Sequence, residues 1–110
     1  MLIDDARAKV YASWFACLAD SSRLRILNLL AGSSGPLTIG EIVEALDIGQ
    51  PTVSHHVRQL EEARFVQCER QGARTLVRVN KRCLRAFPSA AAVVMGSVPA
   101  TEQPWVKSAA

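Results

Sequence analysis

Apolar residues recur along this chain first at helical spacing and then, beyond residue 63, at every second position. The helical spacing covers residues 4–19, 20–31, 39–46 and 50–63, which predicts four helices joined by short connections. The alternating spacing covers residues 65–70 and 74–79, and the intervening stretch 71–73 contains a glycine, so we expect a β-hairpin. One more helix should follow residue 81, kinked or divided by Pro88.

The boundary between the third and fourth helices has the form of a helix-turn-helix. Thr38 followed by Glu41 predicts a capping box at the start of the third helix. Three residues, Asp47 to Gly49, then form a tight turn, and Pro51 opens the fourth helix. In such a motif the second helix enters the major groove of DNA.

The fourth helix has one apolar stripe, formed by Val53, Val57 and Leu60. Its other side chains are short hydrogen-bonding groups, amides or cations, which are the types that read base edges or hold phosphates. The alternative is an ordinary amphipathic surface helix. We predict DNA contacts from this helix by Gln50, Thr52, Ser54, His55, Arg58 and Gln59.

Positive charge is concentrated in and after the hairpin. Residues 64–85 contain seven Lys or Arg and one acid, Glu69, a net charge of +6 against +3 for the whole chain. A cationic strip beside a polar helix is typical of proteins that bind the phosphate backbone. We predict that Arg70 and Arg74, beside the hairpin turn, contact phosphates. The alternative is a solvated surface hairpin.

The length and composition fit one small domain. The chain has 110 residues, of which 49% are hydrophobic and 5% aromatic, so the core must be built from aliphatic side chains. We predict a mainly α fold with a small β-hairpin (α+β), a winged helix-turn-helix, over residues 1–96. Residues 97–110 should form a tail, docked or not through Trp105. With no signal peptide, no membrane span and no C-x-x-C pair, we expect a cytoplasmic protein with reduced cysteines.

Two stretches resemble a known family. WFACLADSSRLRIL at residues 14–27 is similar to the signature of the ArsR/SmtB (arsenical-repressor) family, and QPTVSHHVRQL at 50–60 is similar to its recognition helix. The resemblance covers roughly residues 8–80, with the hairpin where the family wing belongs. It implies a homodimeric bacterial repressor that binds a double-stranded DNA operator with an inverted repeat and leaves it when an inducer binds. It also implies that His55 contacts DNA and that His56 packs between helices.

The resemblance further implies that the first and last helices form the dimer interface. The aromatic residues of the first helix exceed what one small core would cover, in agreement with this role. The interface residues we expect are Val10, Trp14, Phe15, Leu84 and Phe87.

The sequence departs from the family at its known metal sites. Members that sense metals through a Cys-x-Cys pair carry it at the start of the third helix, where this chain has Thr38 and Gly40. Members with a carboxylate-histidine site carry it on the last helix, and residues 81–95 contain no His, Asp or Glu. Neither of the two usual sites is therefore present.

The three cysteines are the soft ligands that remain. Cys83 lies between Arg82 and Arg85, which would favour its thiolate form, and it is the first candidate for binding an inducer, alone or with a cysteine of the other subunit. Cys17 is the second candidate, although a cysteine on an apolar helix more commonly packs as a small hydrophobe. Cys68 alternates within a strand and is interpreted as filler. The candidate inducers are thiophilic ions such as arsenite, cadmium, mercury or zinc, and no cofactor is required for DNA binding.

Two other classes of function compete with a DNA-binding repressor. An enzyme is not expected, because no nucleophile, base and orienting group occur at motif spacing. Two alternatives remain. One is a winged-helix regulator that responds to a redox or protein signal, and the other is a winged helix that binds protein instead of DNA.

Overall fold

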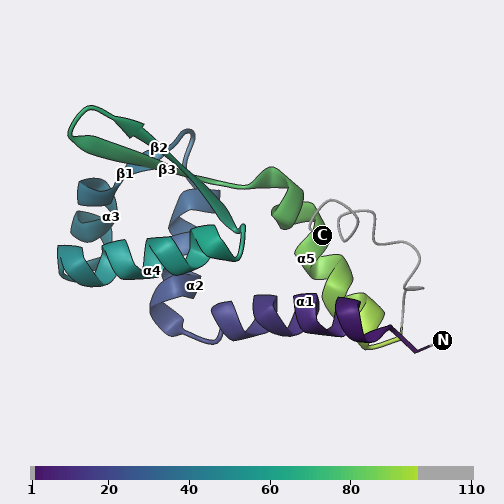
Figure 1. The fold of residues 1–110 in the computed structure, drawn as a ribbon. Coiled ribbons are helices and arrows are strands. Elements are labelled where there is room, and N and C mark those ends of the chain that lie inside the picture. Colours follow the sequence, from purple (N-terminus) through teal and green to yellow (C-terminus); the bar gives the residue numbers. More distant parts are fainter. Residues whose placement is uncertain (1, 97–110) are drawn as a thin grey trace. The chain divides into compact units, whose positions relative to one another are not determined.

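The computed structural model describes residues 2–96, except for the side chain of Leu84, and these residues fall into two compact units. Unit 2 is residues 17–80, and unit 1 comprises the described residues before and after it. Figure 1 shows the elements in chain order: α1 (Asp5–Cys17), α2 (Ser21–Ala31), β1 (Leu37–Thr38), α3 (Ile39–Leu46), α4 (Gln50–Glu62), β2 (Val66–Gln71), β3 (Arg74–Val79) and α5 (Lys81–Val94). The predicted tail and Trp105 lie outside the described residues. None of the described helices is long and apolar enough to cross a membrane.

Side-chain caps fix where the helices of unit 2 begin. An Asp20 carboxylate oxygen accepts a hydrogen bond from the Arg23 amide at 3.1 Å, and α2 starts at the next residue after Asp20. The predicted capping box is present at α3: the Glu41 amide donates to the Thr38 hydroxyl at 3.1 Å, and the Thr38 amide donates to the Glu41 carboxylate at 2.9 Å. The first helix is shorter than expected, since α1 ends at Cys17 and Asp20 belongs to the next helix.

The turn between α3 and α4 spans Asp47, Ile48 and Gly49, as predicted. Asp47 ends α3 in the left-handed region, with φ of 56°, a conformation that aspartate tolerates better than most residues. Gly49 is the N-cap of α4 without a side-chain hydrogen bond, so Pro51 is the second helical residue, one position later than predicted.

The carboxyl end of α4 has the hydrogen bonds of a Schellman motif. The Phe65 amide donates to the Leu60 carbonyl and the Arg64 amide to the Glu61 carbonyl, both at 2.9 Å. Arg64 takes the left-handed position, with φ of 68°, where glycine is usual. Asn80 secures this junction, because its side chain donates to the Arg64 carbonyl at 2.9 Å.

Unit 2 contains a three-stranded antiparallel sheet in the order β1-β3-β2. The β2–β3 hairpin was expected, whereas β1 was missed because two residues are too short to show an alternating pattern. Gln71 is paired with Arg74, so the turn consists of Gly72 and Ala73 and is one residue shorter than predicted. Gly72 has a φ of 62° at the first turn position, as a type II′ hairpin requires.

The core of unit 2 is aliphatic, as the composition indicated. α2, α3, α4 and the sheet each contribute side chains to it. Its buried residues are Ile26, Leu30, Ile42, Leu46, Val53, Val57, Leu60, Phe65, Val66 and Val77.

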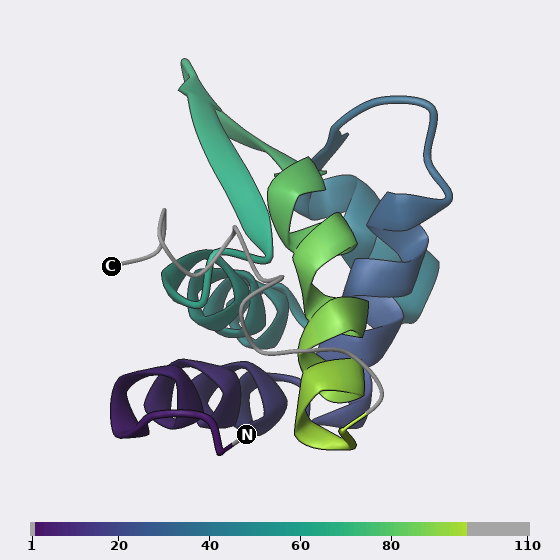
Figure 2. The same ribbon diagram turned by 90° about the vertical axis from the view of Figure 1, so that its right-hand side faces the viewer.

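Unit 1 is built on aromatic contacts between α1 and α5, which run in different directions in Figure 2. The Phe87 ring lies 6.4 Å from the Trp14 ring and 5.3 Å from the Phe15 ring, measured between centroids. Tyr11, which was not among the residues expected here, is 2% exposed and stacks at 5.4 Å on Trp14. Pro88 lies inside α5, which runs without a break from Lys81–Val94, so the prediction of a divided helix was wrong. The missing proline amide removes one helical hydrogen bond without ending the helix.

Candidate nucleic-acid interface

α4 buries its apolar stripe and leaves its polar side chains accessible. Val53, Val57 and Leu60 are at most 4% exposed. The side chains predicted to read bases all lie off this stripe. Gln50, Thr52, His55 and Arg58 are exposed, and Ser54 and Gln59 are half-buried. The six predicted residues therefore form a polar surface along the helix.

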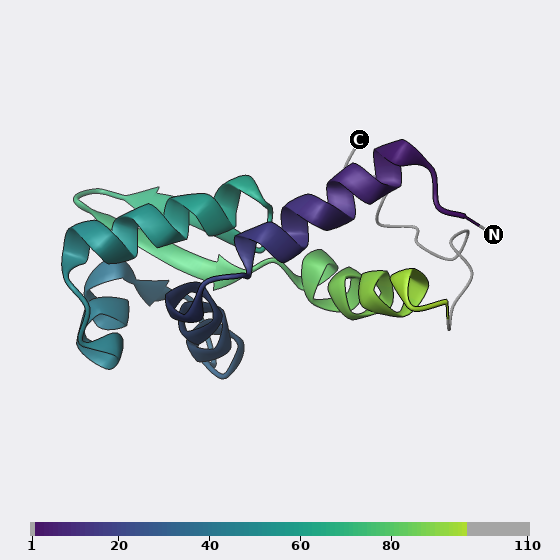
Figure 3. The same ribbon diagram turned by 90° about the horizontal axis from the view of Figure 1, so that it is seen from below.

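The hairpin β2–β3, which we call the wing, reaches the same end of unit 2 as this surface. Figures 1 and 3 both show the wing turn at the end of the unit where α4 begins. The helix that carries the hydrogen-bonding groups thus starts at the end of the unit to which the wing turn reaches. A winged helix uses these two parts together, the helix in the major groove and the wing on the adjacent backbone.

The two predicted wing cations lie on opposite faces of the hairpin. Arg70 is on the face that carries buried Val66 and Val77, and Arg74 is on the other face. Both side chains are exposed, and neither forms an ion pair with any described residue. An anion at the turn of the hairpin can consequently be contacted by Arg70 from one face and by Arg74 from the other.

A third wing cation is already held within the hairpin. Arg78 lies 3.7 Å from the Glu69 carboxylate and donates a hydrogen bond to the Gln67 side chain at 3.4 Å. All three residues lie on the same face, because Gln67 is directly opposite Arg78 and Glu69 is two positions along β2. Arg78 therefore serves the strand pairing, unlike Arg70 and Arg74.

α3, the first helix of the helix-turn-helix, carries acids and no Lys or Arg. The Thr38 amide, which is hydrogen-bonded to Glu41, holds the pKa of this carboxyl below its usual value, and Arg74 adds to the effect. Because α3 exposes Glu41 and Glu44, it repels a phosphate backbone. Within the helix-turn-helix and the wing, exposed cations therefore lie on α4 and the wing and not on α3.

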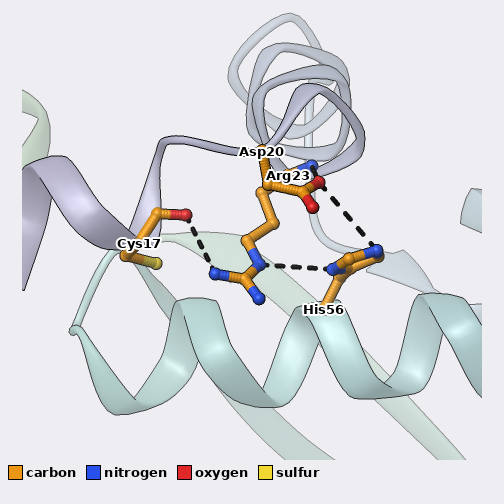
Figure 4. A network of polar contacts seen from close by, with 4 residues as sticks. All are labelled: Cys17, Asp20, Arg23 and His56. Atoms are coloured by element: carbon orange, nitrogen blue, oxygen red, sulfur yellow. Dashed lines mark hydrogen bonds and ion pairs between the residues drawn. The ribbon is translucent and has the colours of Figure 1, made fainter.

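Behind the polar surface of α4, four residues form a polar network that the sequence did not predict (Figure 4). The Arg23 side chain donates through Nε to His56 Nδ1 at 3.2 Å and through Nη1 to the Cys17 carbonyl at 3.1 Å. His56 Nε2 lies 4.0 Å from the Asp20 carboxylate, and the His56 side chain is only 11% exposed. The expected role of His56 as a contact between helices agrees with this geometry. Its members lie in the two stretches that resemble the family, residues 14–27 and 50–60, but the sequence does not show that these stretches meet.

Within the described residues the cysteines are not gathered into a metal site. Among the described residues no group of three or more His, Cys, Asp or Glu side chains is placed to hold a metal ion. Cys17 and Cys83 are buried, and Cys68 is half-buried. Burial raises the pKa of the Cys17 thiol, while burial and the Glu61 carboxylate raise the pKa of Cys68 to about 11. Both thiols are thus protonated at neutral pH and weakly reactive.

The predicted dimer residues divide into buried and accessible ones within unit 1. Trp14 is 2% exposed and is covered inside its own chain, whereas Phe15 is 39% exposed. Val10 and Phe87 are half-buried, and the side chain of Leu84 is outside the described part of the structure. Near the end of α5 the apolar side chains of Val94 and Met95 are 52% and 82% exposed.

Comparison with known proteins agrees with this architecture. A family model for bacterial regulatory proteins of the arsR family matches residues 20–67. The solution structure of the homodimeric winged helix-turn-helix DNA-binding domain Mb0332 of Mycobacterium bovis superimposes with a TM-score of 0.67 at 26% identity, covering 86% of this chain and 90% of that one. The winged helix-turn-helix fold is therefore confirmed.

Two curated relatives carry the sequence comparison. ArsR1 of Pseudomonas putida, an arsenic resistance transcriptional regulator, is 41% identical over 58 residues, which are 53% of this chain and 44% of the relative. The HTH-type transcriptional regulator Rv2034 of Mycobacterium tuberculosis is 39% identical over 76 residues, 68% of this chain and 67% of the relative. The chain thus spans less than half the length of ArsR1. The family consists of regulatory proteins, in agreement with the prediction that the chain is not an enzyme. From the family match, the relatives and the fold together, the chain belongs to the arsR family of bacterial regulatory proteins.

Proposed function

We propose that this protein is a cytoplasmic transcriptional repressor that binds, as a homodimer, an operator with an inverted repeat. One observation carries the proposal: α4, which carries the polar surface, begins at the end of unit 2 where the wing turn lies, and the exposed Arg70 and Arg74 flank this turn. Ser and Thr can bond either partner at a base edge, Gln can pair with adenine, and Arg can pair with guanine. In this assignment α4 reads the sequence and the wing holds the backbone.

A homodimer follows from the symmetry of such operators and from the surface of unit 1. A twofold dimer would place two copies of α4 in successive major grooves, about 34 Å apart. The exposed apolar side chains of Phe15, Val94 and Met95 are available for contact with a second copy. The homodimeric state of the Mb0332 domain supports the same assembly.

Alanine substitutions on α4 test the base-reading assignment. Each of Ser54→Ala, His55→Ala and Arg58→Ala should reduce discrimination between operator and random DNA, with Arg58→Ala losing about 1 to 3 kcal/mol for a bidentate bond to guanine. The measurement is fluorescence anisotropy of the full chain with labelled DNA from its own upstream region and with scrambled DNA of the same length. Glu62→Ala, an exposed position at the far end of α4, is the matched control. If all three variants discriminate as well as the parent, another surface reads the DNA.

The rival function is a winged helix that binds protein. DNA binding through phosphates weakens steeply with salt because counterions are released, and protein binding through apolar contacts does not. If the chain binds no DNA at 50 mM salt but still binds a protein partner at 300 mM salt, the result favours the protein-binding winged helix.

The inducer is a separate question, for which the family suggests a thiophilic ion and ArsR1 is an arsenic regulator. The described residues do not fit a closed metal site in one chain. We infer that a response to such an ion passes through Cys83, which directly follows the wing and precedes most of α5, and that it recruits a cysteine of the second subunit. Cys17 is the second candidate.

The cysteine assignment predicts that Cys83→Ser abolishes release from the operator by arsenite or cadmium. A tenfold loss of operator affinity on binding the ion requires about 1.4 kcal/mol of coupling. Operator binding is measured with and without the ion in the parent, Cys83→Ser and Cys17→Ser, with Cys68→Ser as the control. Unchanged release in Cys83→Ser removes this residue from sensing, and a parent that no ion releases reads a different signal.

A further inference from the structure

We propose that Arg23 is a positioning residue that sets the orientation of α4 for DNA reading without touching DNA itself. This inference rests on the proposed function of α4. Arg23 lies in the first turn of α2, and its guanidinium bonds the last residue of α1 and the middle of α4 (Figure 4). No base-contact or wing assignment includes this residue.

The two side-chain bonds of Arg23 fix its plane. Nε donates to His56 and Nη1 donates to the Cys17 carbonyl, from different edges of one rigid, planar group. The Arg23 backbone is fixed as well, because its amide is bonded to Asp20 at the start of the helix. The backbone of Arg23 is held by Asp20, and one edge of the guanidinium is held by the Cys17 carbonyl. The Nε–H on the other edge therefore points at His56 in a defined direction.

This donor restricts the rotation of α4 more sharply than the apolar stripe does. Burial of Val53, Val57 and Leu60 stabilises the helix, but the hydrophobic effect has no direction. A hydrogen bond weakens steeply when its angle changes. His56 is an immediate neighbour of His55 and lies two residues from both Ser54 and Arg58, so a fixed position of His56 fixes the rotation of the helix segment that carries these side chains.

The same geometry defines the state of the His56 ring. Because Arg23 Nε is always a donor, His56 Nδ1 must be the acceptor, and the neutral ring carries its proton on Nε2, on the side of Asp20. His56 is therefore a reporter of the hydrogen bond that can be followed without DNA.

Charge and geometry are separated by two substitutions. Arg23→Lys keeps the positive charge but replaces the planar fork by a point donor that cannot serve both acceptors. Arg23→Gln removes the charge. If Arg23 positions α4, both variants should lose affinity for the operator by about tenfold, as for loss of a charged hydrogen bond, and keep the parent's salt slope and affinity for random DNA. Arg25→Gln, an exposed residue of the same helix, should match the parent.

A direct bond from Arg23 to a DNA phosphate would give a different result. Arg23→Lys would then bind like the parent, and Arg23→Gln would weaken operator and random DNA alike, with a salt slope lower by about 0.9 for each phosphate that is no longer neutralised. This pattern overturns the proposal. A double variant adds a further check: if Arg23 acts through His56, Arg23→Gln should reduce operator affinity no further in a His56→Phe background, with the fold of each variant verified by circular dichroism. Additive losses would contradict it.

A measurement without DNA separates this inference from the proposed function. Nitrogen-15 NMR of the His56 ring should show an unprotonated Nδ1 in the parent, and Arg23→Gln should shift both the ring signals and the backbone amides of residues 54–58. A protonated Nδ1 in the neutral ring, or unchanged amides in Arg23→Gln, overturns the positioning role. If the parent binds no DNA but the NMR shifts occur as expected, the repressor assignment is contradicted and the positioning of α4 by Arg23 is not.

Discussion

Replacing both Arg70 and Arg74 by alanine should make DNA binding by this protein much less sensitive to salt. Each neutralised phosphate contributes about 0.9 to the slope of log affinity against log salt, so the four wing arginines of a dimer contribute about 3.6. Over a fourfold rise in salt this slope corresponds to roughly 150-fold in affinity. The measurement is operator binding by parent and double variant between 50 and 200 mM KCl. Random DNA should show the same change, because bonds to phosphate carry no sequence information.

Arg78→Ala is the matched control for the wing. Arg78 has the same charge and lies in the same strand as Arg74, but its guanidinium is engaged with Glu69 and Gln67. We expect its removal to change the slope by less than the amount for one phosphate. If the Arg70→Ala/Arg74→Ala variant keeps the parent's slope, or if Arg78→Ala has the larger effect, the wing assignment is wrong.

Ile42→Ala should lower the free energy of unfolding by about 2 to 5 kcal/mol. Ile42 is 0% exposed in α3, so truncation removes buried apolar surface and leaves a space that its neighbours fill only partly. A domain of this size has about 5 to 15 kcal/mol of stability in total, so the helix-turn-helix would be strongly compromised. Urea unfolding followed by circular dichroism gives the midpoint and slope.

Glu44→Ala, two residues further along α3, provides the comparison. Glu44 is exposed, and its replacement should change stability by no more than about 0.5 kcal/mol. A destabilisation below about 1 kcal/mol for Ile42→Ala would mean that α3 is not packed as described.

The helices and the wing could be predicted because their signals are local. The stripe of Val53, Val57 and Leu60 lies within one helix, and the box of Thr38 and Glu41 spans four consecutive residues. Each was found where it was expected. The positions of the reading residues off the apolar stripe of α4 follow from the same periodicity. The hairpin followed from its alternation and one glycine, although the turn is a residue shorter.

Features that depend on distant segments were missed. Strand β1 exists only because β3 lies beside it, and two residues carry no pattern of their own. The hydrogen bond between Arg23 and His56 joins residues 33 positions apart. Local propensity predicted a last helix kinked or divided by Pro88, but α5 is not divided there, since packing of its neighbours can outweigh one missing hydrogen bond. Trp14 was predicted at the dimer interface, and the sequence did not show that it is 2% exposed within its own chain, where its ring contacts Tyr11 and Phe87.

The order of the two units along the chain has a consequence for synthesis. Unit 2 is one uninterrupted segment, whereas unit 1 needs α1 from before it and α5 from after it. A ribosome adds about 5 to 20 residues per second, so the last residue of unit 2 is made roughly 0.4 to 1.4 s before Phe87, whose ring packs on Trp14. During this interval the aromatic face of α1 is open to premature association. The pair of helices proposed for dimerisation is complete only when α5 has been made, after all of unit 2.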